Sequence, residues 1–392
     1  MPPLSAGTAT RAITPPPELQ PGYLAGFQPG NRLSEGVHDD LHARALALSD
    51  GTTTVVLAAL DLIGYTQGET RPLRTQIGEA DEAHIILAAT HTHSGPDTIG
   101  LWGPSLLESG VSEAYMAFLR GRVREAILAA IADLAPAELT AAAGRLPDGL
   151  LKNIRVPDLL DREISVLRAQ RPDGSTIATL VHFAAHPEIL VYDNRLISSD
   201  FPHYLRDRVE AELGGSALFL NGALGGMVTP DVSANTFAEA ERVGHAAAEA
   251  ALSALKAAQP VSRADIVAGR AFVHIPPENE LLKAAVAMGI IKADVTTEGD
   301  FRAEVHHLRI GEAAEIVTLP GEAFPSVGLR LKESMAAPVR FVIGLANDEL
   351  GYMMPPEDYG KDLYSLERRS CVGPLAAERC QAALQELMAR AR

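Results

Sequence analysis

Cysteine is nearly absent from this chain, which excludes a whole class of stabilising and metal-binding frameworks. Only Cys371 and Cys380 occur among 392 residues, and their spacing matches no metal-binding motif. Two cysteines in a chain of this length predict free thiols in a reducing compartment rather than a disulfide framework.

Positive charge and long apolar runs are also scarce. The chain has 34 lysines and arginines against 50 aspartates and glutamates, a formal net charge of −16. This balance argues against nucleic acid or an anionic membrane surface as a general partner. Residues 1–7 have neither the basic nor the apolar part of a signal peptide. No run of 18 apolar residues lacks charges or turn signals, so we expect no membrane span and a cytoplasmic location.

The order of predicted elements indicates an α/β fold with mixed β-sheets and flanking helices. The first 36 residues are rich in proline and glycine and predict a turn-laden arm on the surface. We predict strands at 41–47, 54–62, 85–89, 164–168, 177–184, 217–220, 266–275, 301–310, 315–319 and 339–345. We predict helices at 112–134, 201–213, 237–257, 279–291, 325–335 and 374–391. The pattern favours one domain over residues 1–392, in which Pro260 could mark a subdomain edge.

One motif carries most of the functional information. Thr90-His91-Thr92-His93-Ser94-Gly95-Pro96 directly follows the apolar run 85–89. Positions i and i+2 of a strand face the same side, so both imidazoles can point into one cleft at the strand's C-terminal end. Open α/β sheets usually build their sites at such ends. The alternative is a pair of polar residues on a solvated loop.

Three other buried strands end in the same way, with polar residues next to glycine or proline. His186 follows the run 179–183, Glu322 follows the run 315–318, and the stretch 344–347 after 339–343 leads to Tyr352. Two histidines and a glutamate form a common catalytic zinc set that leaves a position open for water or substrate. Taken singly, each strand end has a plain structural explanation, but taken together they favour a metal site.

Other polar positions are ambiguous. Asp61 ends an apolar strand, where it could orient a ligand histidine or be a buried carboxylate paired elsewhere. Asp200 is better explained as a helix N-cap. The glycine-rich segment 221–230 contains no phosphate-binding motif and favours a close backbone approach to a ligand or metal. The remaining histidines that we considered, His38, His182, His203, His245, His306 and His307, carry weaker signals.

Together these motifs resemble the neutral, non-lysosomal ceramidases. The resemblance is carried by Thr90–Pro96, by His186-Pro187, by Pro320-Gly321-Glu322, and by the stretch 344–352 with 356–359 beyond it. It covers nearly the whole chain as the N-terminal catalytic domain of that family, and the order and type of four separated motifs make it specific.

The resemblance implies amide-bond hydrolysis with one zinc ion. By position, the metal ligands would be His91, His186, Glu322 and Tyr352. The catalytic and substrate-contacting positions match His93, Arg155 and Tyr364, the match at Arg155 being approximate.

Two departures from the family pattern stand out. Where the family has Gly-Asp-Val-Ser-Pro, residues 225–230 lack the acid, and Thr229 stands at the position of the serine. The family's C-terminal immunoglobulin-like domain is also not expected, since the chain ends at Arg392. The resemblance therefore implies the metal site more strongly than the substrate.

The favoured hypothesis is a zinc-dependent hydrolase that cleaves a linear amide bond, in ceramide or another small or lipid-like N-acyl amide, with metal-activated water. His93 would act as the base, and Arg155 and Tyr364 would stabilise the oxyanion. Two alternatives remain: a metallo-esterase or lactonase on the same centre, and a catalytically silent metal- or ligand-binding protein.

Overall fold

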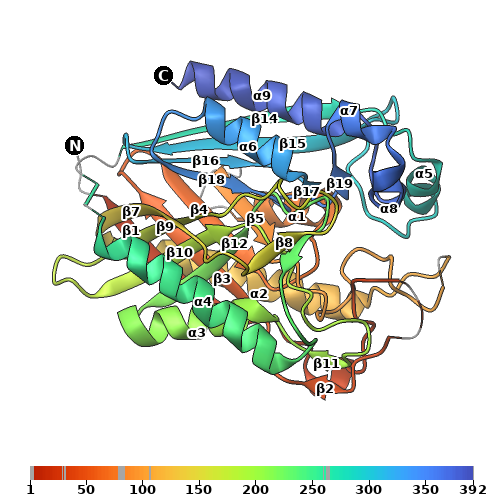
Figure 1. The fold of residues 1–392 in the computed structure, drawn as a ribbon, viewed down its shortest axis with the longest axis horizontal. Helices are drawn as coiled ribbons and strands as arrows, with labels where there is room; N and C mark the ends of the chain where they lie inside the picture. The colour runs from red at the N-terminus through yellow and green to blue at the C-terminus, as the bar shows by residue number, and fades with distance from the viewer. Residues whose placement is uncertain are drawn as a thin grey trace.

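Three mixed β-sheets with helices on their outer faces make up the protein (Figure 1). The computed structural model describes residues 4–28, 30, 32–77, 84–105, 107–258, 260–261 and 265–391. The first sheet has the order β5-β4-β3-β1-β6, the second β12-β10-β9-β7 and the third β14-β15-β16-β18. These findings confirm the α/β class with mixed sheets and flanking helices.

The strands of the first sheet are β1 (Ser5–Ala12), β3 (His42–Ser49), β4 (Thr54–Leu60), β5 (Ile85–Ala89) and β6 (Ala135–Pro136). Those of the second are β7 (Glu138–Arg145), β9 (Glu163–Gln170), β10 (Thr176–Phe183) and β12 (Ser216–Asn221). Those of the third are β14 (Ile266–Ile275), β15 (Phe301–Ile310), β16 (Ala314–Thr318) and β18 (Val339–Ile343). Short strands form three further pairs: β2 (Gly36–Val37) with β11 (Leu196–Ile197), β8 (Leu151–Asn153) with β13 (Val228–Pro230), and β17 (Glu322–Ala323) with β19 (Tyr352–Met353).

The helices are α1 (Gln67–Thr75), α2 (Glu113–Ala132), α3 (Phe201–Leu213), α4 (Phe237–Lys256), α5 (Glu280–Ala287), α6 (Pro325–Ser334), α7 (Pro356–Tyr359), α8 (Ser365–Arg369) and α9 (Ala376–Arg390), with short 3₁₀ turns η1 (Pro17–Leu19) and η3 (Asp362–Tyr364). The predicted N-cap of α2 is confirmed, because the Ser112 side chain accepts a hydrogen bond from the Tyr115 backbone N–H. Both predicted hairpins are present as the antiparallel pairs β9–β10 and β15–β16.

The inner faces of the three sheets share one hydrophobic core. On β4, Val55 and Leu57 face this core, which also takes side chains from β10, β15 and β18, whereas Val56 and Leu60 face α2. Helices α3 and α4 cover the outer face of the second sheet, and α6 and α9 cover that of the third (Figure 1). Strands buried on both faces explain the continuous apolar runs in the sequence. Residues beyond 260 therefore pack on the same core as those before it.

The N-terminal segment differs from our prediction of a surface arm. Residues Ser5–Ala12 form β1, which pairs antiparallel with β3 along its whole length and with β6 at one end. Its small residues have little apolar signal, but a Cβ at Gly7 would lie only 2.3 Å from the Ala130 carbonyl oxygen of α2. Close packing of helix against strand, which needs a glycine there, decides this element.

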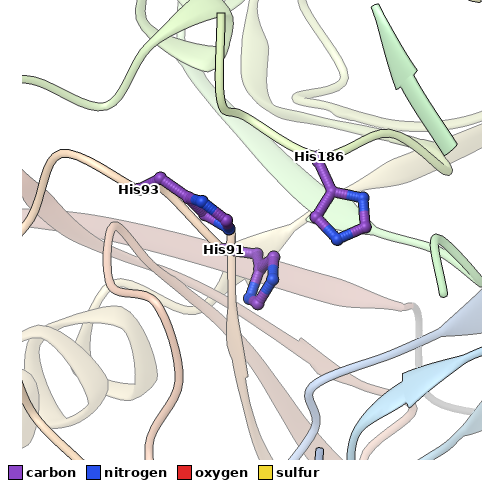
Figure 2. Close-up of side chains that lie close together, drawn as sticks. All are labelled: His91, His93 and His186. Carbon is purple, nitrogen blue, oxygen red and sulfur yellow. The ribbon is translucent and has the colours of Figure 1, made fainter. Parts of the chain in front are cut away.

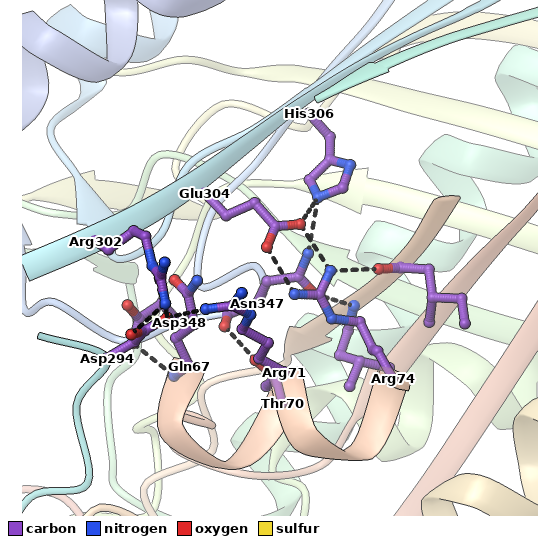
Figure 3. A network of polar contacts seen from close by, with 12 residues as sticks. Gln67, Thr70, Arg71, Arg74, Asp294, Arg302, Glu304, His306, Asn347 and Asp348 are labelled. Atoms are coloured by element: carbon purple, nitrogen blue, oxygen red, sulfur yellow. Dashed lines mark hydrogen bonds and ion pairs between the residues drawn. The ribbon is translucent and has the colours of Figure 1, made fainter. Parts of the chain in front are cut away.

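Strand β7 was not predicted, and neither was helix α1. Helix α1 is held by a buried polar network that joins it to β15 and to the loop after β18 (Figure 3). Two bonds of 2.7 Å join the Arg74 guanidinium to the Glu304 carboxylate, and Glu304 also contacts His306. The Asn347 amide lies 3.0 Å from His306 Nε2 and accepts a bond from the Leu87 N–H. Tertiary contacts of this kind stabilise a helix whose own sequence contains Pro72.

Asp348 borders this network and makes stability depend on pH. Its Oδ1 accepts hydrogen bonds from the backbone N–H groups of Gln67 and Glu349. Burial raises the pKa of Asp348 to about 7, and the negative charges of Asp294 and Glu304 add to the rise. The unfolded carboxyl ionises near its ordinary value of 3.8, so the folded protein holds an extra proton between that value and about 7. The free energy of unfolding therefore falls as pH rises through this window.

We expect Asp348→Asn to remove this fall in the free energy of unfolding, because the amide keeps the acceptor oxygen and carries no charge. The variant should exceed the wild type in free energy of unfolding at pH 8 by about 1 kcal/mol or more, with a smaller difference at pH 5. Denaturant titrations at both pH values measure this, with Asp193→Asn at an exposed position as the charge-matched control. Identical pH dependence in Asp348→Asn and the wild type would contradict the argument.

Candidate metal centre

Three histidine rings converge at one point, from the loops that follow β5 and β10 (Figure 2). One ring nitrogen from each of His91, His93 and His186 lies within 4.8 Å of the others, so the three can hold a metal ion. His91 and His186 are buried, and His93 is nearly so. Each of the three large sheets has one parallel strand pair, β4–β5, β10–β12 or β16–β18, and candidate residues follow the carboxyl ends of all three pairs.

The sequence predicted that the His91 and His93 side chains face one cleft, but the expected reason, strand alternation, is wrong. Strand β5 ends at Ala89, and His91 has a φ of +73°, so the pair does not lie on one face of an extended strand. A positive φ is uncommon for a residue other than glycine, and it persists only where surrounding contacts stabilise it. Here the His91 N–H donates to the Leu62 carbonyl, and the ring donates to the Ile63 carbonyl.

His91 and His186 are each oriented by a backbone carbonyl. The Nδ1 of His91 lies 2.6 Å from the Ile63 oxygen, and the Nδ1 of His186 lies 2.8 Å from the Val228 oxygen. A carbonyl only accepts, so each Nδ1 carries the proton. This is the arrangement usual for histidines that bind metals through Nε2.

Glu322, which follows strand β16 of the third sheet, lies next to His91 and His186. Its Oε2 lies 3.1 Å from His186 Nε2 and 3.5 Å from His91 Nε2. Burial alone would raise the pKa of Glu322, but His91 and His186 outweigh it and hold that pKa well below its usual range. Burial lowers the pKa of His186, yet Glu188 and Glu322 raise it to about 9. The site therefore favours positive charge between these side chains.

Tyr352 lies beside Glu322 because β17 and β19 pair in parallel with these two residues in register. Its hydroxyl contacts the Met227 sulfur at 3.6 Å. Burial raises the pKa of Tyr352 well above its usual value, and Glu322 and Glu188 raise it further. The turn before it requires Gly351, since a Cβ there would lie 1.6 Å from the Ser370 carbonyl oxygen.

His93 differs from the other two histidines in its partners. Neither of its ring nitrogens has a hydrogen-bond partner, although both are buried. Its Nδ1 lies 3.6 Å from Glu188 Oε2, beyond hydrogen-bond distance. Burial, followed by the charges of His91 and His186, lowers the pKa of His93 well below its usual value. The ring is therefore a neutral group with a free acceptor nitrogen.

The other predicted catalytic residues have the following partners. Arg155 Nε donates to Glu367 Oε1 at 2.6 Å. The Tyr364 ring packs against Phe324, and burial raises the pKa of its hydroxyl. Thr229 is buried on β13, one residue after the carbonyl that orients His186.

The ambiguous polar positions now have partners. Asp61 forms a two-bond ion pair with Arg206 and also accepts from the His42 N–H, so its role is that of a buried paired carboxylate. Asp200 is the N-cap of α3, as predicted. The segment 221–230 lies close to another part of the backbone at Gly225, where a Cβ would lie 2.3 Å from the Glu322 carbonyl oxygen. Its approach to a ligand or metal stays a prediction.

Two acidic neighbours of the site were not predicted. Glu188 faces His93, and Glu349 is buried with its pKa raised well above the usual range, first by burial and then by Glu322. Glu188 stands two residues after His186, a signal that the sequence contained. No such signal marked Glu349, because a loop acid between Asp348 and Leu350 is ordinarily solvated.

Within the described part of the chain, none of the helices is long and apolar enough to cross a bilayer.

Comparison with known proteins identifies relatives of this chain. Residues 6–246 match the family model for the neutral/alkaline non-lysosomal ceramidase N-terminal region. The neutral ceramidase of Mycobacterium tuberculosis is 24% identical over 216 residues, covering 49% of this chain and 34% of that protein. The neutral ceramidase of Pseudomonas aeruginosa is 27% identical over 201 residues, covering 46% and 30%. The alignments thus span about a third of the length of these relatives.

Solved structures match over nearly the whole chain. The crystal structure of neutral ceramidase from Pseudomonas aeruginosa superposes with a TM-score of 0.82 at 20% identity, over 99% of this chain and 74% of that one. A ceramidase complexed with C2 gives a TM-score of 0.80 at 21% identity, with the same coverage. At this identity the likeness establishes the fold.

Proposed function

The chain belongs to the neutral/alkaline non-lysosomal ceramidase family, and from this premise we propose that it hydrolyses a linear amide bond, in ceramide or another N-acyl amide, at one zinc ion. The observation that carries the proposal is the meeting of two carbonyl-oriented histidines with a buried glutamate. Two histidines and one carboxylate are a common catalytic zinc set.

The residues present fit a cation. His91 and His186 carry their protons on Nδ1, which leaves Nε2 of each to bind, and both Nε2 atoms face the same Glu322 oxygen. The pKa of His186 is raised to about 9 by Glu188 and Glu322 despite burial, so these acids favour a positive charge there. A bound zinc ion would neutralise the same carboxylates without a proton.

We assign the ligands as His91, His186, Glu322 and Tyr352, and assign His93 to catalysis. Ligand histidines almost always donate their second nitrogen to an oxygen, as His91 and His186 do. His93 lacks such a partner. The competing assignment uses His93 as a third histidine ligand, since its ring lies close enough to the other two.

When bound, zinc would act as a Lewis acid on the substrate carbonyl and lower the pKa of water. His93 is suited to take a proton, because its ring is neutral with a free acceptor nitrogen. Arg155 and Tyr364 are the donors for a developing oxyanion, with Glu367 holding the Arg155 guanidinium through Nε. Thr229 supplies a hydroxyl next to the carbonyl that orients His186.

Metal analysis and paired substrates test the proposal. The protein purified without chelator should contain about one zinc per chain, and it should hydrolyse N-acyl amides of a preferred chain length. Amide and ester analogues with the same acyl chain, compared by kcat/KM, separate an amidase from an esterase or lactonase. Absence of bound metal would refute the metal centre. Bound metal without turnover of either series would favour a silent binding protein.

A further inference from the structure

The side chain of Asn221 lies between the two loops that carry His91 and His186. Asn221 is the last residue of β12 and is fully buried. Strand β12 pairs in parallel with β10, so its carboxyl end reaches the same level as the start of the His186 loop. A buried carboxamide must have its hydrogen bonds satisfied, so the identity of its partners is informative.

Every bonding position of this carboxamide is occupied. The Nδ2 group donates to the Thr90 oxygen at 2.9 Å and to the Ala185 oxygen at 2.8 Å. The Oδ1 atom accepts from the N–H of Ala185 at 3.1 Å and from the N–H of Gly222 at 2.9 Å. Two donors and two lone pairs are all that an asparagine side chain offers.

Three of these four bonds go to backbone groups of the residues that precede the predicted ligands. Thr90 immediately precedes His91, and Ala185 immediately precedes His186. The main-chain oxygen of Asn221 also accepts from the Gly344 N–H, at the end of β18. One residue therefore links the carboxyl ends of β5, β10 and β18, which belong to three different sheets.

We propose that Asn221 is a positioning residue of the metal centre: its carboxamide cross-links the backbones before His91 and His186 and so sets the separation of these two ligands. The inference rests on the proposed zinc centre. The His91 backbone has a positive φ and needs such restraint from its surroundings. Aspartate cannot replace asparagine, since an oxygen in place of Nδ2 would face two carbonyl oxygens and lose both donated bonds.

The test compares Asn221→Asp and Asn221→Ser with the wild type and with Leu308→Ala. Leu308 is buried in the core shared by the sheets and makes no part of the site, so its variant reports the effect of lost stability alone. The Ser variant keeps the experiment decisive if the Asp variant does not fold, as judged by circular dichroism. Zinc affinity is measured by competition with a chromophoric chelator, and ligand geometry by the absorption spectrum of the Co²⁺ form.

We expect both Asn221 variants to bind zinc about 10-fold to 100-fold more weakly than the wild type and to give an altered Co²⁺ spectrum. Leu308→Ala should melt at a lower temperature but keep the wild-type affinity and spectrum. Wild-type affinity and spectrum in a folded Asn221 variant would overturn the inference while leaving the metal centre intact. A wild-type protein that binds neither ion would overturn the centre itself, and this inference with it.

Discussion

Replacing His186 with alanine is expected to abolish both stoichiometric zinc and turnover. His186 Nε2 lies 3.1 Å from Glu322 Oε2, and its Nδ1 is held by the Val228 carbonyl, so the ring supplies one oriented nitrogen to the site. Its loss leaves Glu322 as a buried carboxylate with fewer positive partners. The variant should contain less than about a tenth of the wild-type zinc after dialysis, since second-sphere changes alone cost 10-fold to 100-fold in affinity.

Strand β10, which precedes the loop that carries His186, offers a matched control for this substitution. His182 on β10 is also buried, and its ring contacts the Leu220 carbonyl and the Val342 N–H rather than the site. His182→Ala should lower the melting temperature and keep its zinc. Elemental analysis of both variants decides the matter, and stoichiometric zinc in His186→Ala would show that the ligand assignment is wrong.

His93→Ala is expected to lose turnover as His186→Ala does, but to keep its zinc. Both ring nitrogens of His93 are buried without partners, which makes the ring free to exchange a proton with substrate or water. Removal of a general base typically lowers kcat by about 10²-fold to 10⁴-fold. Metal content and kcat should be measured on the same preparation, with His186→Ala beside it.

The result of the His93 substitution separates two arrangements of the centre. If His93→Ala loses zinc as fully as His186→Ala does, the ion is held by the three histidines that lie within 4.8 Å of one another. His93 would then be a ligand rather than a catalytic base, and the four-ligand set proposed above would be wrong. Retained zinc with a wild-type kcat would remove His93 from catalysis altogether.

Local sequence signals marked the candidate site residues, but they did not indicate how the side chains come together. Each of His91, His186 and Glu322 follows a buried apolar run, a signal visible without a structure. Strand alternation was the expected reason for the pairing of His91 with His93, yet β5 ends before either residue. The loop conformation, with φ of +73° at His91, brings the rings together instead.

Elements with weak local signals were the ones missed. Strand β1 consists of small and polar residues and exists because β3 pairs with it and α2 packs on it at Gly7. Helix α1 contains Gly68 and Pro72, which disfavour a helix, and the Arg74–Glu304 ion pair ties it to β15. Such stabilisation comes from residues distant in the chain, so no local window contains it.

The sequence by itself determined the fold class and the family and marked candidate residues for a metal site, because apolar periodicity and short motifs are properties of local segments. Only the tertiary structure decided the pairing of Glu322 with Tyr352, the partners of Asp61 and the lack of hydrogen-bond partners at the His93 ring nitrogens. The same holds for Asn221, a polar residue at a strand end whose bonds to Thr90 and Ala185 follow from the packing of separate sheets. Contacts between residues that are distant in the chain depend on how whole strands and sheets pack, which no local pattern specifies.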